Sequence, residues 1–207
     1  MIINIIDYGM GNLQSVNNAL EILNCNSRIS NKASDIDNAD AIILPGVGSF
    51  GQAMDNLESL NLITSLRQAV LDSKKPFLGI CLGMQLFADR SEEQGGHRGL
   101  SLIPGEVREI PIREKLRLPH IGWNDLQINK SRPLFEGIDD KSAFYFVHSY
   151  RFECDDKYVT SKTRYGSDIT SSIQSNNIFG VQFHPERSQR KGLHLLDNFI
   201  KYVAEQC

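Results

Sequence analysis

The stretch LGICLGMQLF, residues 78–87, holds one cysteine, Cys81, between Gly79 and Gly83 in an otherwise apolar run. Residues 76–80, directly before Cys81, form a short apolar run that is typical of a buried strand. The residues after Cys81 predict a helix. A cysteine that is buried only for packing does not need a glycine two residues away on each side. The pattern G-x-C-x-G between a strand and a helix is instead typical of a nucleophile elbow, a turn so tight that its neighbours have no room for a Cβ atom.

The elbow predicts a reactive thiol, and a reactive thiol needs partners. The predicted helix directs its positive N-terminal end at the sulfur, which favours the thiolate. A nucleophile also needs a general base and a group that orients the base. His184 follows the predicted strand 177–183, and Glu186 lies two residues further on, on the same side of an extended segment. Cys81, His184 and Glu186 therefore form a candidate nucleophile, base and orienting group.

Acyl transfer also requires donors for a developing oxyanion. The sequence PGVG, residues 45–48, follows the predicted buried strand 41–44. If these strands are parallel, this loop lies at the same edge of the sheet as the elbow, and glycines allow its amides to approach a ligand closely. The amide of Leu82, directly after the nucleophile, is the other natural donor.

The pattern of apolar residues predicts one α/β domain over residues 1–207, with a mixed, mostly parallel central sheet flanked by helices. Strand and helix patterns alternate in the first half, whereas closely spaced strands with polar turns in the second half indicate antiparallel pairing. The predicted strands are 2–6, 41–44, 76–80, 144–152, 157–165, 168–174 and 177–183. The predicted helices are 13–24, 52–73 with a break near Asn61, 82 to about 88, and about 189–203.

Charge and cysteine content exclude several classes of function. The formal net charge is −3, which gives no global basic field for nucleic acid. The four cysteines are far apart and form no C-x-x-C, which argues against a disulfide framework and a cysteine zinc site. Without a signal-peptide pattern or a run of about 20 apolar residues, we expect a cytoplasmic protein that does not enter a membrane.

Three motifs in this order, PGVGSF, GICLGMQ and FGVQFHPE, resemble those of the class I, or triad, glutamine amidotransferases. The resemblance covers essentially the whole chain. Two further stretches, PHIGWN at 119–124 and YFVHSYR at 145–151, are similar to the subfamily of glutaminase subunits of imidazole glycerol phosphate synthases, which act in histidine biosynthesis. The resemblance implies hydrolysis of glutamine to glutamate and ammonia through a cysteinyl thioester, without a metal or an organic cofactor.

The resemblance also implies roles for individual positions. Cys81 would attack the side-chain amide, His184 would transfer protons, and Glu186 would orient His184. Positions that match the substrate-binding residues of the family are Gly46, Val47, Gly48, Leu82, Gln85, Glu93, Ser149 and Tyr150. Positions that match the partner-facing residues are Asn12, Trp123, Tyr145 and Arg187. The implied partner is a (β/α)₈-barrel cyclase, which would form a heterodimer with this chain and receive the ammonia.

Alternatives remain open within and outside this family. Related subunits serve anthranilate, pyridoxal or amino-sugar synthesis with the same triad, and the acceptor of the ammonia lies on another chain. Residues 46–51 also fit the dinucleotide-binding pattern G-x-G-x-x-G, although Asp72 does not end a strand as that fingerprint requires. His184 and Glu186 fit the H-x-E of zinc deaminases, but the second motif, P-C-x-x-C, is missing. A non-catalytic binding module is disfavoured by the complete triad.

Two histidines and one basic stretch receive no role from the sequence. His120 and His148 lie within the subfamily motifs, and each can equally be an interior histidine with satisfied hydrogen bonds. The basic stretch 108–117 also contains glutamates, so a solvated loop or a partner-facing edge is the simplest interpretation.

Overall fold

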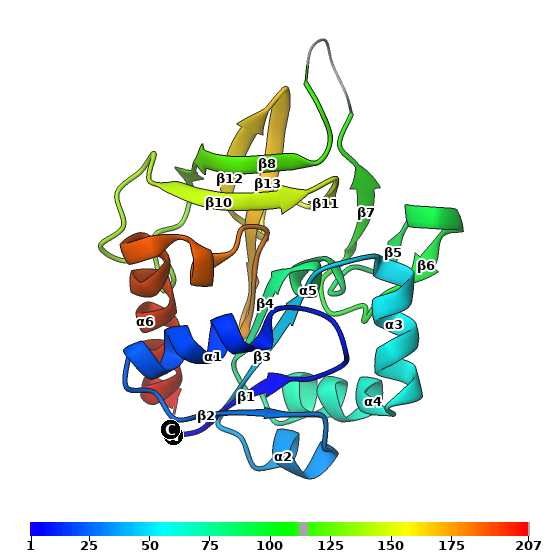
Figure 1. Ribbon diagram of the computed structural model, residues 1–207, viewed down its shortest axis with the longest axis vertical. Coiled ribbons are helices and arrows are strands. Elements are labelled where there is room, and N and C mark those ends of the chain that lie inside the picture. The colour runs from blue at the N-terminus through cyan, green and yellow to red at the C-terminus, as the bar shows by residue number, and fades with distance from the viewer. Residues whose placement is uncertain (112–115, 207) are drawn as a thin grey trace.

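An eight-stranded mixed sheet forms the centre of the molecule (Figure 1). The computed structural model describes residues 1–111 and 116–206. The strand order is β2-β1-β3-β4-β14-β13-β12-β9, parallel from β2 to β14 and antiparallel from β14 to β9. The strands are β1 (Ile3–Ile6), β2 (Ser27–Ser30), β3 (Ala41–Gly46), β4 (Phe77–Cys81), β9 (Gln127–Ile128), β12 (Val159–Tyr165), β13 (Ser167–Ser175) and β14 (Ile178–Val181). The predicted α/β class with a mostly parallel sheet is confirmed.

Two smaller sheets lie beside the main one. β8 (His120–Asp125) and β10 (Ala143–His148) form a two-stranded antiparallel ribbon, which we call the β8–β10 ribbon. The other small sheet has the order β11-β7-β5-β6, with β5 (Arg90–Ser91), β6 (His97–Arg98), β7 (Gly105–Glu109) and β11 (Tyr150–Cys154). The prediction of one continuous strand over 144–152 is wrong, because the chain leaves the ribbon at Ser149 to pair with β7 instead. Of the basic stretch 108–117, Arg108 and Glu109 belong to β7, and residues 112–115 lie outside the described residues.

The helices follow the predicted pattern with three differences, the first of which is that the short helix α2 (Ala33–Asp37) was not predicted. The helices are α1 (Leu13–Ile22), α2 (Ala33–Asp37), α3 (Phe50–Ser59), α4 (Leu62–Arg67), α5 (Leu82–Gln85) and α6 (Gln189–Gln206). The predicted break near Asn61 is confirmed, since this residue has a left-handed φ of 55° between α3 and α4. After α4 a π-helical turn covers Gln68–Asp72. The helix after Cys81 is shorter than predicted, because the amides of Phe87 and Ala88 already bond three residues back, as in a turn.

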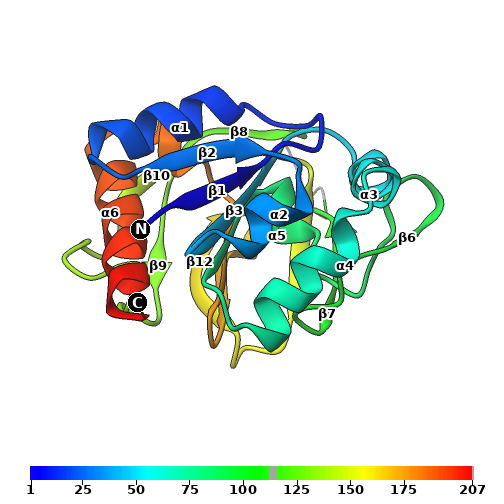
Figure 2. The same ribbon diagram turned by 90° about the horizontal axis from the view of Figure 1, so that it is seen from below.

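Helices cover both faces of the main sheet, and strand alternation explains how. In β3 the side chains of Ile42 and Leu44 enter one apolar cluster, whereas those of Ala41 and Ile43 enter the other. The first cluster includes side chains of α2, α3, α4 and α5, and the second includes side chains of α1 and α6 (Figure 2). None of the helices in residues 1–111 and 116–206 combines the length and hydropathy of a membrane span.

The carboxyl ends of three neighbouring strands meet at one edge of the main sheet. β3 and β4 pair in parallel up to Gly46 and Cys81, and β14 pairs with β4 through Val181 and Ile80. Ligands of open α/β sheets bind at the carboxyl ends of the strands. The elbow, the PGVG loop and the segment that leads to His184 are therefore brought to the same edge.

Candidate active site

Cys81 lies in a strained turn, and the glycines around it are required by close packing. The φ and ψ angles of Cys81 are 55° and −111°, a conformation that side chains with a Cβ atom rarely adopt. A Cβ on Gly83 would lie 1.7 Å from the carbonyl oxygen of Leu44, and one on Gly79 would lie 2.7 Å from the amide nitrogen of Met84. The predicted lack of room for a Cβ at both glycines is confirmed.

The imidazole of His184 is held by Glu186. Nδ1 of His184 lies 2.8 Å from Oε1 of Glu186, and both side chains are almost fully buried. The backbone at His184 is extended as predicted, but Pro185–Arg187 form a 3₁₀ turn rather than a continued extended segment. Proline is well suited to the first position of such a turn, because its missing amide hydrogen is not needed there.

The electrostatics of His184 are set by two opposing effects. Burial on its own would lower the pKa of His184, but the charge of the Cys81 sulfur and the Glu186 carboxylate raise that pKa to about 10. The Nε2 atom is buried and makes no hydrogen bond of ordinary geometry within the described residues. The ring is therefore protonated at neutral pH, and because Nδ1 is bonded to Glu186, Nε2 is the nitrogen that is left to exchange a proton.

The Cys81 sulfur has two further polar neighbours that the sequence analysis missed. Nε2 of Gln182 donates to Sγ at 3.7 Å, and Sγ lies 3.7 Å from the carbonyl oxygen of Val147. Gln182 is completely buried beside the end of β14. The signal that could have identified it is a buried amide in the otherwise apolar run before His184, since a fully buried polar group requires a partner.

The PGVG loop lies beside the elbow. Gly46 is the register partner of Cys81, and Gly48 has a φ of 112°, in the region that favours glycine. Val47 between them is 44% exposed. A Cβ on Gly46 would lie 2.2 Å from the hydroxyl oxygen of Tyr8, a buried residue that has no hydrogen-bond partner for this hydroxyl within the described residues. Burial raises the pKa of Tyr8, and the charge of the nearby Cys81 sulfur raises it further.

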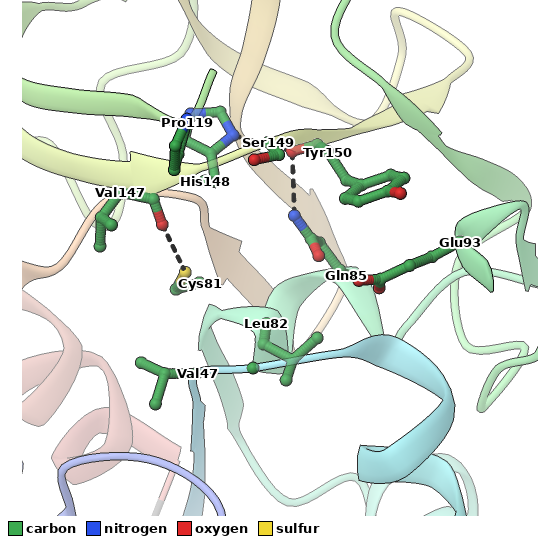
Figure 3. Close-up of a pocket in the computed structure, with 11 residues that line it drawn as sticks. Val47, Cys81, Leu82, Gln85, Glu93, Pro119, Val147, His148, Ser149 and Tyr150 are labelled. Carbon is green, nitrogen blue, oxygen red and sulfur yellow. Dashed lines mark hydrogen bonds between the residues drawn. The ribbon is translucent and has the colours of Figure 1, made fainter.

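A cavity of about 260 Å³ opens beside the sulfur (Figure 3). This size is near the lower limit of small-molecule sites, roughly 300 Å³, and suits a compact metabolite. The residues that line it are Val47, Gly48, Cys81, Leu82, Gln85, Glu93, Pro119, Val147, His148, Ser149 and Tyr150. Seven of the eight positions that match substrate-binding residues of the family thus surround one cavity, and the eighth, Gly46, lies beside Cys81 in the sheet. Pro119, Val147 and His148 were not predicted to line it.

Gln85 and Glu93 are each held by hydrogen bonds to other segments of the chain. Nε2 of Gln85 donates to the carbonyl oxygen of Tyr150 at 3.0 Å and to Oε1 of Gln182 at 2.9 Å. Both of its amide hydrogens are therefore used, and Oε1 remains as an acceptor. Oε2 of Glu93 accepts the amide hydrogen of Phe50 at 2.7 Å and so caps the first turn of α3.

Three of the four positions that match partner-facing residues gather on the outer side of the β8–β10 ribbon. Trp123 and Tyr145 are register partners with ring centroids 6.2 Å apart, and the guanidinium of Arg187 lies 5.8 Å from the Tyr145 ring. Trp123 is 48% exposed. Asn12 lies at the N-terminus of α1, where its side chain accepts the amide hydrogen of Ser15 at 3.2 Å. No hydrogen bond or ring contact joins Asn12 to the other three within the described part of the chain.

No cluster of His, Cys, Asp or Glu side chains suited to a metal ion occurs in residues 1–111 and 116–206. The cavity is instead lined by the Cys81 thiol, the Gln85 amide, the Glu93 carboxylate and backbone groups, and the His184–Glu186 pair lies outside this lining, next to the Cys81 sulfur. These are the groups that acyl transfer requires: a nucleophile, a proton carrier and donors for an oxyanion.

Comparison with known proteins gives one consistent result. The family model for glutamine amidotransferase class-I matches residues 4–202. The chain is 50% identical over 197 residues to imidazole glycerol phosphate synthase subunit HisH 1 of Campylobacter jejuni (strain RM1221), covering 95% of this chain and 98% of that protein. It is 49% identical over 204 residues to the HisH subunit of Aquifex aeolicus (strain VF5), covering 98% and 97%.

Solved structures show the same fold at low sequence identity. A glutamine amidotransferase crystal structure superimposes with a TM-score of 0.77 at 17% identity, covering 99% of this chain and 100% of that chain. The structure of PurLQS from Thermotoga maritima gives a TM-score of 0.74 at 18% identity, covering 98% of this chain and 98% of the matched one. At these identities the likeness concerns the fold alone.

Proposed function

The chain belongs to the class-I glutamine amidotransferase family, and from this premise we propose that it is the glutaminase subunit of an imidazole glycerol phosphate synthase. The relatives that carry this name are about half identical over nearly the full length of both chains. The observation that carries the chemistry is the arrangement at the sheet edge, where the Cys81 elbow lies next to a buried His184–Glu186 pair. We further propose that residues 1–207 act as one amidotransferase domain in the cytoplasm.

We propose that hydrolysis proceeds through a thioester on Cys81. The sulfur attacks the side-chain amide carbon of glutamine, and the C–N bond breaks while His184 gives a proton to the leaving ammonia. Neutral His184 then takes a proton from water, whose oxygen attacks the thioester carbon; the C–S bond breaks, which releases glutamate and restores the Cys81 thiolate. The proton taken from water leaves the imidazole charged again, and the carboxylate of Glu186 stabilises this charged form.

The proposed roles of the other residues follow from their places around the cavity. The amides of Leu82 and of the PGVG loop are next to the sulfur and suit the oxyanion that forms in each step. Oε1 of Gln85 and the Glu93 carboxylate can accept hydrogens from the α-ammonium group of glutamine. The backbone at Ser149 and Tyr150 completes the binding site on the opposite wall.

A synthase of this kind implies a partner, and we propose a cyclase with a (β/α)₈ barrel. The ammonia would pass to this partner, which uses it to make imidazole glycerol phosphate and aminoimidazole carboxamide ribotide. The partner-facing residues would be Asn12, Trp123, Tyr145 and Arg187. Support comes from the Trp123–Tyr145–Arg187 cluster, an aromatic and arginine group of the kind that is enriched in protein interfaces.

The test is Cys81→Ala in the complex with the cyclase. We expect this variant to lose glutamine hydrolysis and glutamine-dependent synthesis, because the nucleophile is absent. Synthesis from added ammonium salt should stay near the wild-type rate, because the cyclase site lies on the other chain. Measuring both rates on the same preparation provides the control for assembly.

Two results would contradict the proposal. Ammonium-dependent synthesis that disappears together with glutamine hydrolysis would contradict separate sites. A wild-type chain that hydrolyses glutamine but does not support imidazole glycerol phosphate formation with any cyclase would instead favour a related amidotransferase that serves an anthranilate or amino-sugar synthase.

A further inference from the structure

Two buried histidines of the β8–β10 ribbon form a hydrogen-bonded pair that the catalytic chemistry does not use. His120 and His148 are register partners in β8 and β10, and Nδ1 of His120 lies 3.0 Å from Nε2 of His148. Both residues are at most 6% exposed. The His120 ring is stacked between Phe146 and Tyr165, with centroid distances of 4.9 and 4.1 Å. The pair is therefore fixed by packing as well as by its hydrogen bond.

The partners of the pair determine where each hydrogen lies. Nδ1 of His148 is 2.7 Å from the carbonyl oxygen of Tyr150, and because a carbonyl only accepts, this nitrogen carries a hydrogen. Burial lowers the pKa of His148 to about 3 and that of His120 to about 4, so both rings are neutral. Nε2 of His148 is then an acceptor and Nδ1 of His120 its donor. Nε2 of His120 accepts in turn from Nδ2 of Asn124 at 3.2 Å.

In this series of hydrogen bonds each group donates to the next group nearer the substrate cavity. The series begins at Asn124, which also donates to the carbonyl oxygen of Arg164 at 3.0 Å, and ends at the carbonyl oxygen of Tyr150. The same carbonyl accepts the hydrogen bond already described, from Nε2 of Gln85. The two hydrogen bonds on this oxygen therefore fix the wall of the cavity opposite the elbow, and His148 itself lines that cavity (Figure 3).

We propose that His120 and His148 are positioning residues for glutamine, which hold the Tyr150 carbonyl and through it the Gln85 side chain in the arrangement that binds the substrate. This inference rests on the proposed function. Among the described residues neither histidine of the pair is hydrogen-bonded to the sulfur or to His184, so loss of the pair affects substrate binding rather than the transfer of protons. A residue that contributes equally to binding the substrate and the transition state changes KM and leaves kcat nearly constant.

The test compares two substitutions of His120 in the complex with the cyclase. His120→Phe keeps a planar ring for stacking but removes the donor to His148, and we expect the KM for glutamine to rise about tenfold with kcat within about twofold. His120→Asn keeps an N–H near the Nδ1 position, and we expect it to recover most of the wild-type KM. Ammonium-dependent synthesis should be unchanged in both variants.

Thr163→Val is the matched control. Its hydroxyl donates to the carbonyl oxygen of Asp125 at 2.8 Å, so the variant also loses a buried hydrogen bond at β8 but leaves the histidine pair intact. We expect its thermal midpoint to fall and its KM for glutamine to stay at the wild-type value. An equal rise in KM in Thr163→Val would overturn the proposal, because general loosening of the ribbon would then explain the effect.

The position of the hydrogens can be measured without any substitution. Nitrogen-15 NMR of the histidine-labelled wild-type complex at neutral pH should show His120 and His148 neutral and protonated at Nδ1. Protonation of His148 at Nε2, or a KM for His120→Phe within twofold of wild type, would overturn the proposal. These outcomes can be distinguished from a failure of the proposed function, because in that case the wild-type complex itself would not hydrolyse glutamine.

Discussion

At the scale of single residues, His184 is the group whose charge state decides how the site works. Its ring is buried, which disfavours the charged form, yet the Cys81 sulfur and Glu186 raise its pKa to about 10. The charged form is therefore present at neutral pH and is lost only as the pH rises through about 10. In the proposed mechanism the charged ring supplies the proton for the leaving ammonia, so we expect this value to set the alkaline limit of the reaction.

Glu186→Gln should move that alkaline limit to lower pH. The substitution removes one of the charges that raise the pKa of His184, while the amide oxygen can still accept the hydrogen at Nδ1. We expect the single-turnover rate of ammonia release to decline at a pH at least one unit below that of the wild type. A profile with the same alkaline limb in both proteins would show that Glu186 does not support the charge on His184.

Tyr8→Phe should stabilise the protein or leave its stability unchanged. The Tyr8 hydroxyl is buried without a hydrogen-bond partner within the described residues, and such a group costs about 1–3 kcal/mol. Removing it should therefore raise the free energy of unfolding, measured by urea denaturation, by as much as about 1 kcal/mol. A fall in the free energy of unfolding of more than about 1 kcal/mol would mean that the hydroxyl has a partner in solution. Phe50→Leu, in the same apolar cluster, provides a destabilised reference.

A residue of the site could be predicted when the pattern that identifies it lies within a few neighbouring positions of the sequence. Cys81 could be predicted because its glycines and its strand and helix are adjacent in sequence, and Glu186 could be predicted from its spacing to His184. Gln182 and Tyr8 could not, because each reaches the sulfur region through contacts between segments far apart in sequence. For His120 and His148 the sequence left two interpretations, and only the pairing of β8 with β10 shows that they bond to each other.

At the scale of elements, the junction of β4 and α5 has no tolerance for added atoms. Gly83→Ala would place a Cβ 1.7 Å from the Leu44 carbonyl oxygen, which is backbone and cannot move aside. We expect a loss of about 3 kcal/mol or more in the free energy of unfolding, or no folded protein.

Gly95→Ala is the comparison, since no atom lies within 4 Å of its added Cβ. Its left-handed φ of 106° should cost only about 1–2 kcal/mol. Equal losses in the two variants would contradict the close packing at the elbow.

Among the elements, the buried apolar strands, the longer strands β12 and β13 and the amphipathic helices were predictable, and the two-residue strands were not. β3, β4 and β14 are apolar because helices or other layers cover both of their faces, and this composition is visible in the sequence. β5, β6 and β9 have two residues each, too few for a period to appear. The break at Ser149 was missed because its neighbours on both sides are typical strand residues, and the change of sheet depends on partners elsewhere in the chain.

At the scale of the whole molecule, the β8–β10 ribbon separates two environments. Its inner face carries the histidine pair against the cavity, and its outer face carries Trp123 and Tyr145. Large aromatic side chains that are partly exposed on such a face are typical centres of binding energy. We therefore place the proposed cyclase contact on the outer face.

Trp123→Ala should weaken the assembly without affecting the fold. We expect the Kd for the cyclase to rise about 30-fold or more, corresponding to about 2 kcal/mol, by isothermal titration calorimetry. Leu60→Ala serves as the control, because Leu60 is a similarly exposed apolar residue between α3 and α4. Its Kd should match the wild type, and an unchanged Kd for Trp123→Ala would place the contact on another face.

Cys81 ends a strand at the middle of the main sheet, with β3 on one side and β14 on the other. Amide hydrogens of such a strand exchange with solvent only when the domain unfolds as a unit, whereas a two-stranded ribbon opens through smaller fluctuations. The proposed nucleophile is thus held by slowly exchanging backbone, whereas the proposed partner surface belongs to a segment that deforms at lower cost. Docking can reshape the entrance of the cavity while the sulfur keeps its place.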